Sequence, residues 1–195
     1  MNLFPNFVDV FLLTSSSKTD GILFNVTGVS FIVFDTHKLT PDFILFNIYF
    51  PNSGKEGSRL DFKVQFCNEL LSQLVELKNE GKNLVITGDY NIAHNPIDVY
   101  NPKNCEGKSG YLPEERAWLD ELEEAGFVDT FRMFDEGEGN FTWWSYRFKA
   151  RERNSGWRLD YFFVNEEIKD NVISAKILAD IYGSDHCPVT LELDF

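Results

Sequence analysis

Residues 83–91 read NLVITGDYN, a short apolar run that passes directly into a polar turn. The run from Leu84 to Thr87 is typical of a buried β-strand. Because side chains alternate along an extended chain, the carboxylate of Asp89 and the carboxamide of Asn91 lie on the same side. Such a pair can hold a water molecule beside a phosphate oxygen. Taken alone, this motif more often forms an Asx turn that ends a strand, and both interpretations stay open here.

The segments around this run alternate between strand and helix periods. Apolar runs predict strands at 22–26, 29–34, 43–50, 141–144, 157–164, 173–178 and 189–195. Apolar residues at three- and four-residue spacing predict an amphipathic helix over 60–77, with Ser58 and Asp61 as a capping box. A second helix is predicted over 113–126. The mixture indicates an α/β (α+β) fold, and the length indicates one domain over 1–195.

Two further polar clusters lie at the ends of predicted apolar strands. Residues 157–163 read WRLDYFF, in which Arg158 and Asp160 project to one face. The pair is either a simple ion pair or leaves Asp160 to orient a histidine. Residues 183–188 read GSDHCP, so that Asp185 and His186 lie between a turn and a strand, where catalytic side chains are often found. Together with 88–91, these clusters predict a metal-assisted hydrolase.

The charge of the chain limits its partners. A net charge of −13 argues against a protein that coats nucleic acid without specificity. Any contact to DNA therefore needs metal ions or a local basic patch. A long loop rich in Asn, Pro, Gly and Lys is predicted over about 92–112. Five basic residues stand against one acid between 147 and 158, and with two lysines of the long loop they predict a phosphate-contacting surface: Arg147, Lys149, Arg151, Arg153, Arg158, Lys103 and Lys108. The alternative is an ordinary solvated loop.

The cysteines and the apolar runs bear on the compartment. The three cysteines are odd in number and widely spaced, which predicts reduced thiols in a cytosolic protein. No run approaches the roughly 20 apolar residues of a membrane span, so we expect no membrane partner.

A series of ordered motifs carries a closer resemblance. The motifs are IYFPNSG (48–54), GDYNIAH (88–94), ID (97–98), NPK (101–103), FTWW (141–144), GWRLDYF (156–162) and GSDHCP (183–188). From about Phe43 to the C-terminus, the chain resembles the exodeoxyribonuclease III and AP endonuclease branch of the endonuclease/exonuclease/phosphatase superfamily. That resemblance implies a four-layer sandwich of two mixed β-sheets flanked by helices. It also implies a DNA repair nuclease that uses Mg²⁺ or Mn²⁺ and cuts 5′ to abasic sites or removes nucleotides at 3′ ends.

The resemblance implies catalytic roles residue by residue. Asp160 would orient His186 against the scissile phosphate. Asp89 would activate the attacking water, with Asn91 holding that water or the phosphate. Tyr49 would donate a hydrogen bond to the phosphate.

The resemblance also implies a metal site and a substrate surface. Asp185, Asp89 and Asn91 would hold the metal. Side chains implied to bind substrate are Asn52, Trp143, Trp157, Arg147 and Lys103, whereas Trp144 is expected in the core. The implied partner is double-stranded DNA with abasic sites or 3′ ends. We expect a monomer in the cytoplasm, associated with the nucleoid.

The chain departs from the family pattern at its start. The family opens with a Trp-Asn strand and then a strand that ends in Gln-Glu, whose Glu is the main metal ligand. Residues 1–40 match this pattern poorly, and neither pair occurs. We therefore expect the family's N-terminal strands to be missing, one sheet to be short, and this chain alone to have little or no cleavage activity. The alternatives are an inactive DNA-binding remnant or another phosphodiesterase or phosphatase of the superfamily.

Overall fold

The computed structural model describes residues 12–13, 19–26, 29–36 and 43–195, and the side chains of 43–195. In these ranges the strands are β1 (Leu12–Leu13), β2 (Thr19–Val26), β3 (Val29–Thr36), β4 (Ile44–Asn47), β5 (Leu84–Asp89), β6 (Phe127–Asp129), β7 (Asp160–Asn165), β8 (Val172–Ile177) and β9 (Val189–Leu193). The α-helices are α1 (Leu60–Asn79), α2 (Pro102–Cys105) and α3 (Pro113–Glu124). Short 3-10 helices are η1 (Lys55–Gly57), η2 (Pro96–Asp98), η3 (Phe131–Met133), η4 (Arg147–Lys149) and η5 (Glu166–Asn171).

The largest sheet has the strand order β4-β5-β7-β6. β4 runs parallel to β5, and the other two pairings are antiparallel. Every residue of β5 and β7 is buried, which agrees with their nearly continuous apolar sequences. These two central strands therefore form a rigid base for the polar residues at their ends.

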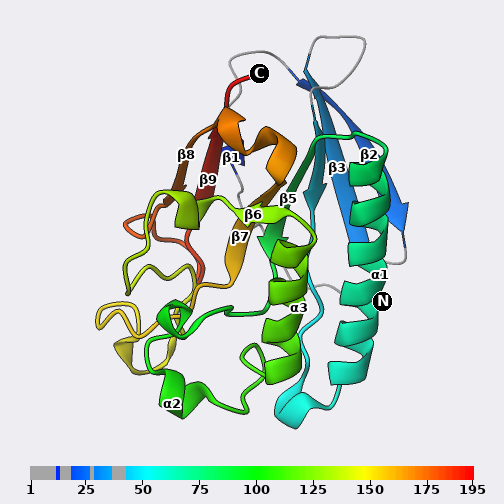
Figure 1. Ribbon diagram of the computed structural model, residues 1–195. Coiled ribbons are helices and arrows are strands. Elements are labelled where there is room, and N and C mark those ends of the chain that lie inside the picture. Colours follow the sequence, from blue (N-terminus) through cyan, green and yellow to red (C-terminus); the bar gives the residue numbers. More distant parts are fainter. Residues whose placement is uncertain (1–11, 14–18, 27–28, 37–42) are drawn as a thin grey trace, which may run out of the picture.

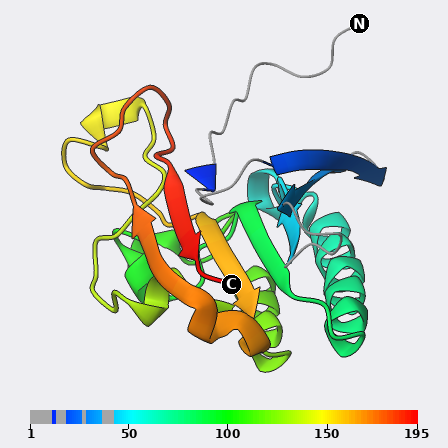
Figure 2. The ribbon, with the colours of Figure 1, turned by 90° about the horizontal axis from the view of Figure 1, so that it is seen from above.

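A second mixed sheet packs against the first. Its order is β1-β9-β8, with β1 parallel and β8 antiparallel to β9. Buried side chains of both sheets, among them Val85, Phe162 and Leu191, form one apolar cluster between the layers, and Figure 2 shows the two layers from above. The expected pair of mixed sheets is confirmed. β2 and β3 form a separate antiparallel pair, which confirms the strands predicted at 22–26 and 29–34.

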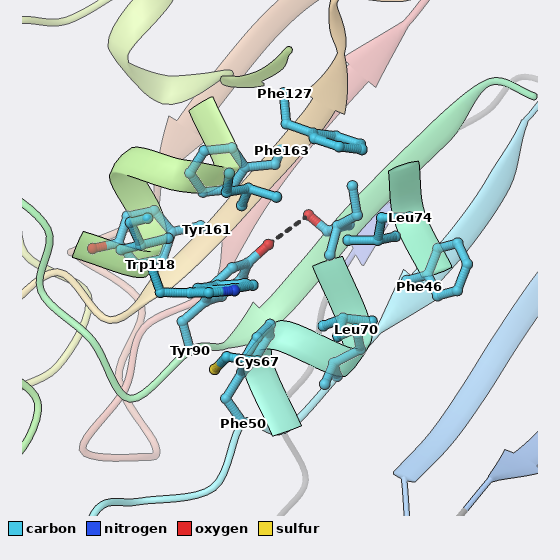
Figure 3. Close-up of a cluster of buried hydrophobic side chains, with 14 of the residues drawn as sticks. Phe46, Phe50, Cys67, Leu70, Leu74, Tyr90, Trp118, Phe127, Tyr161 and Phe163 are labelled. Carbon is cyan, nitrogen blue, oxygen red and sulfur yellow. Dashed lines mark hydrogen bonds between the residues drawn. The ribbon is translucent and has the colours of Figure 1, made fainter. Parts of the chain in front are cut away.

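Helices α1 and α3 cover the other face of the larger sheet (Figure 1). Beneath them lies an aromatic cluster in which Phe50 stacks on Tyr90 at 4.2 Å and Trp118 packs beside both. Tyr90 donates its hydroxyl to the backbone oxygen of Ile86 at 3.4 Å (Figure 3). Burying each such ring contributes about 1.5–3 kcal/mol. This core holds Tyr90, and with it the turn after β5, in place.

Two local predictions are wrong. Helix α1 has Arg59 at its N-cap with no side-chain hydrogen bond, so Ser58 and Asp61 do not form a capping box. Residues 141–144 form no strand, because the backbone N–H groups of Thr142 and Trp143 both donate to Trp157 O. Trp143 makes isolated bridges instead, one to Trp157 and one to His186.

The remaining expectations concern the N-terminal strands and a membrane-spanning helix. Most positions of 1–40 lie outside the described residues, so the expected loss of N-terminal strands stays a prediction. Among the described helices, none has the length and apolar character needed to cross a bilayer.

Candidate active site

The adjoining ends of β5 and β7 bring two carboxylates together. The register of this antiparallel pair places Asp89 opposite Asp160, and residues directly opposite each other present their side chains on the same face. Both residues are nearly buried, with exposed fractions of 6% and 3%. The loops that carry the other predicted site residues gather at this end of the sheet, on the side of α2 (Figure 1).

The predicted partner of Asp160 is present. His186 Nδ1 lies 2.8 Å from Asp160 Oδ2. A carboxylate oxygen accepts a hydrogen bond from an imidazole N–H, so this contact suits the tautomer with its proton on Nδ1 and leaves Nε2 as the other ring nitrogen for exchange with a substrate. Thr142 Oγ1 accepts hydrogen bonds from the backbone N–H groups of Leu159 and Asp160, which fixes the start of β7. Thr142 thus fixes the backbone of Asp160, and the carboxylate of Asp160 contacts the imidazole of His186.

The turn after β5 forms the Asx turn that is one of the two interpretations of its sequence. Asn91 N donates to Asp89 Oδ1 at 2.8 Å, which is the Asx turn, and Asn91 has a left-handed φ of 51°. The carboxamide of Asn91 also donates to Asp89 Oδ2 at 3.2 Å and to Phe50 O at 3.0 Å. Asn52 Nδ2 donates to Asn91 Oδ1 at 3.1 Å. The turn therefore fixes a carboxylate and two carboxamides as one connected group.

Asp185 is tied to the tryptophan that was predicted to bind substrate. Trp143 Nε1 donates to Asp185 Oδ2 at 3.0 Å, and Ser184 Oγ lies 3.3 Å from Asp185 Oδ1. The Trp143 and Trp157 rings meet edge to face at 6.5 Å, and both are only partly buried. Trp144 is buried, as expected for a core residue.

Tyr49 lies just after β4 and is 57% exposed. It precedes Phe50, whose backbone oxygen accepts from Asn91. The predicted phosphate-binding hydroxyl is thus carried by the segment that also supports the turn after β5.

The predicted basic surface is smaller than the sequence indicated. Arg158 is 1% exposed and does not belong to it, because its guanidinium pairs with Asp98 at 2.7 Å and Asp129 at 2.6 Å. Arg151 lies between the Trp144 and Tyr182 rings and donates to backbone oxygens. The exposed basic side chains of this set are Arg147, Lys149, Arg153, Lys103 and Lys108.

The Arg158 network lowers the pKa of the Asp98 carboxyl. Burial alone raises the pKa of the Asp98 carboxyl, but attraction and hydrogen bonding from Arg158 hold it below its usual range. Hydrogen bonds from Asn95 N and Arg132 act in the same direction. The backbone N–H of Arg158, which lies two residues before Asp160, also donates a hydrogen bond to Asp98 O. The network therefore fixes the backbone just before β7, and the charge of Arg158 is not available to a phosphate.

Comparison with known proteins agrees with this geometry. The sequence model of the endonuclease/exonuclease/phosphatase family matches residues 10–186. The chain belongs to this family. An exodeoxyribonuclease of Bacillus subtilis is 46% identical over 145 residues, which are 74% of this chain and 57% of the relative. The zebrafish (Danio rerio) DNA repair nuclease APEX1 is 40% identical over 154 residues, which are 78% of this chain and 49% of the relative.

Solved structures of the endonuclease/exonuclease/phosphatase fold superpose well. The AP endonuclease LMAP of Leishmania major has a TM-score of 0.73 at 29% identity and covers 83% of this chain and 53% of its own. A Neisseria 3′ phosphatase bound to product DNA hairpin has a TM-score of 0.77 at 24% identity, covering 86% of this chain and 65% of its own, which supports the fold alone. The chain spans about half the length of the curated relatives that it matches.

The family depends on divalent metals, and the site fits such an ion only in part. The oxygens of Asp89, Asn91 and Asp185 suit a hard cation such as Mg²⁺. However, the part of the chain with described side chains contains no group of three or more His, Cys, Asp or Glu residues that could hold a metal. These side chains therefore do not make a complete metal site.

Two buried residues that support the site were not singled out from the sequence. Thr142 accepts the two N–H groups at the start of β7. Lys63 donates to Asn91 O and to Glu115, and all three side chains are buried. A signal for Lys63 existed, because it lies four residues before Cys67, which belongs to the apolar face of α1.

Proposed function

We propose that the chain acts on DNA as a phosphodiesterase of the exodeoxyribonuclease III type, cutting 5′ to abasic sites or removing nucleotides at 3′ ends. The observation that carries this proposal is the contact of His186 with Asp160 at 2.8 Å, next to a strand register that sets Asp89 opposite Asp160. A correctly oriented imidazole beside a buried carboxylate suits attack of water on a phosphate. The names of the relatives support the choice of DNA as substrate.

In this proposal each side chain has a separate task. Asp89 accepts the proton of the attacking water while Asn91 keeps the carboxylate in position. The water oxygen bonds to phosphorus, the bond from phosphorus to the 3′ oxygen breaks, and the departing oxygen takes a proton from solvent. His186, kept in one tautomer by Asp160, stabilises the phosphate oxygens as negative charge grows. Tyr49 donates its exposed hydroxyl to the same phosphate.

The surface around the site supports DNA as the ligand. Phe148 is 83% exposed between the exposed basic residues Arg147 and Lys149. Alternating aromatic and basic side chains suit contacts to bases and phosphates. The partly buried Trp143 and Trp157 offer an apolar wall on which an extruded abasic sugar can pack.

The metal in this proposal is Mg²⁺ or Mn²⁺. Asp89, Asn91 and Asp185 would supply part of its oxygen ligands, and the ion would supply charge stabilisation at the phosphate. None of the proton transfers above depends on the position of that ion.

Gel electrophoresis of end-labelled duplexes tests the proposal. One duplex carries a tetrahydrofuran abasic analogue, a matched duplex carries none, and an inositol phosphate tests for a phosphatase. We expect incision of the abasic duplex in Mg²⁺, slower than by the Bacillus subtilis relative, and none in EDTA or with Asp89→Ala. Incision that survives Asp89→Ala, or turnover of the inositol phosphate alone, would overturn the proposal.

A second candidate function is DNA binding without turnover. It is favoured by the exposed Arg147, Phe148 and Lys149, whose contacts to phosphates and bases do not depend on a metal ion. Fluorescence anisotropy of the abasic duplex in EDTA distinguishes the two functions. Tight, abasic-selective binding without incision in Mg²⁺ or Mn²⁺ would support the second candidate.

A further inference from the structure

Lys63 is a buried cation that the proposed chemistry does not use. It lies on α1 and is 1% exposed. Its Nζ donates one hydrogen bond of 2.7 Å to Asn91 O and one of 3.0 Å to Glu115 Oε1 on α3. A lysine is rarely buried unless its charge is paired. The two contacts therefore explain why a lysine occupies the apolar face of this helix.

Glu115 extends the connection to the long loop before α3. Its Oε2 accepts the backbone N–H of Gly110 at 2.7 Å and that of Leu112 at 3.0 Å. Gly110 O in turn accepts Ala93 N at 2.8 Å. The ion pair and the loop thus attach to the turn after β5 at two points, namely the carbonyl of Asn91 and the N–H of Ala93.

The carbonyl is the critical point, because Asn91 has a left-handed backbone. Its φ is 51°, which non-glycine residues adopt at a cost and keep only when their surroundings fix them. The N–H of Asn91 is fixed by Asp89, and its carboxamide by Phe50 O and Asn52. Without Lys63, the buried carbonyl would lose this donor, and the peptide plane would be able to rotate.

The geometry supports a role for Lys63 and Glu115 as a unit. Lys63 Nζ lies 3.0 Å from Glu115 Oε1, and both side chains are buried. Loss of either member would therefore leave the other as a buried charge without this partner.

The pair also joins α1 to α3, which by itself would be a purely structural role. The same two helices have a second connection at their other ends, where Lys78 Nζ donates to Ala125 O at 2.5 Å. Lys78 is fifteen residues further along α1, which is about 22 Å along a helix axis. Lys78 thus offers a matched lysine-to-carbonyl contact that is remote from the site.

We infer that Lys63 and Glu115 are positioning residues for the reaction, and that they act by fixing the left-handed Asn91 whose carboxamide holds Asp89. The inference rests on the proposed function for its kinetic consequence, and on the geometry alone for its effect on Asn91.

Two readouts on Lys63→Met, with Lys78→Met as the control, test this inference. The first is hydrogen exchange of the Asn91 backbone amide, followed by NMR of protein labelled with ¹⁵N at its asparagines, in which the Asn91 signal is identified by its absence in Asn91→Gln. We expect exchange at least ten times faster in Lys63→Met than in Lys78→Met at equal global stability, adjusted with urea. The second is incision kinetics on the abasic duplex, where kcat should fall about 100-fold with little change in KM.

The outcomes separate this inference from the proposed function. Equal exchange of the Asn91 amide in both variants overturns the inference, whether or not the wild-type chain cleaves DNA. Absence of wild-type cleavage counts against the proposed function, and faster Asn91 exchange then still supports the positioning role. If the wild type cleaves and Lys63→Met retains the kcat of Lys78→Met, Lys63 and Glu115 only join α1 to α3, and the positioning role is overturned. Glu115→Gln, which keeps an acceptor for Gly110 N, should produce a smaller effect of the same kind.

Discussion

Replacement of Arg158 by Met tests the buried charge network at the start of β7. Arg158 Nε and Nη2 contact the two oxygens of Asp98 at 2.7 and 3.2 Å, and Nη1 contacts Asp129 at 2.6 Å. Met fills much of the same space without charge, so both acids remain buried. Among the described residues, Arg132 is then the charged partner that Asp98 keeps. Removing one member of a buried ion pair costs about 3–5 kcal/mol. Because domains of this size are stable by about 5–15 kcal/mol, the loss is a large fraction of the total.

The pH dependence of this loss has a definite sign. In the wild type the pKa of Asp98 is lowered, so its contribution to stability is present above the unfolded pKa of about 4 and is lost as the pH falls below it. Burial is the largest influence on the pKa of Asp98, and without Arg158 it is opposed by the hydrogen bonds from Asn95 N and Arg132. We therefore expect the pKa of Asp98 in the variant to rise above that of the unfolded chain. The folded variant then prefers the protonated acid, and its stability falls as the pH rises. The deficit should be larger at about pH 8 than at about pH 5.5.

Urea unfolding followed by tryptophan fluorescence measures the deficit at both pH values. Lys149→Met is the control, because it removes an exposed ion pair with Glu152 and should cost little. A deficit for Arg158→Met below about 1 kcal/mol at neutral pH, or one that is equal at both pH values, would refute the reasoning.

Three further predictions concern other parts of the molecule. Asp160→Asn keeps the side-chain shape but weakens the acceptor for the imidazole, so kcat for abasic incision should fall about 10²–10⁴-fold, and an unchanged kcat would remove Asp160 from the mechanism. Gly88→Ala should abolish soluble expression, because a Cβ would lie 1.9 Å from the backbone oxygen of Ile48. Gly107→Ala is the control: its Cβ would lie in open space, and the protein should lose only about 1–2 kcal/mol of stability because of the positive φ. Equal soluble yields of the two variants would contradict this. Burial raises the pKa of the Cys67 and Cys187 thiols to about 12, so neither should react with Ellman's reagent near pH 8 before unfolding, and rapid labelling of the native protein would show otherwise.

Much of the fold could be predicted because its central elements have strong local patterns. The continuous apolar runs of β5 and β7 predict strands buried on both faces, and both are fully buried. The contact of Asp160 with His186 could be predicted only through the resemblance, since nothing in the spacing of two residues 26 positions apart gives their distance. The Asx turn at Asn91 followed from its local sequence.

The failures arise where distant residues decide the local structure. From its sequence neighbours, Arg158 was predicted to join the phosphate-contacting surface or to pair with Asp160, yet its partners Asp98 and Asp129 come from other segments. Residues 141–144 have strand composition, but a strand needs a partner along its length, and Trp143 finds only single bridges. Lys63 was missed because its partners lie 28 and 52 residues away.

The chain leaves β5 after Asp89, passes through the edge strand β6, and pairs with β5 again from Asp160 onward. The meeting of the two acids is set by the register of these strands and not by the length of the intervening chain. Insertions or exchanges in the loops between them can therefore change which ligand is recognised without moving the acids. Deletion of a single residue inside either strand would instead turn its acid to the opposite face. The sheet end is thus a fixed base, and the loops are the part on which new specificities can be built.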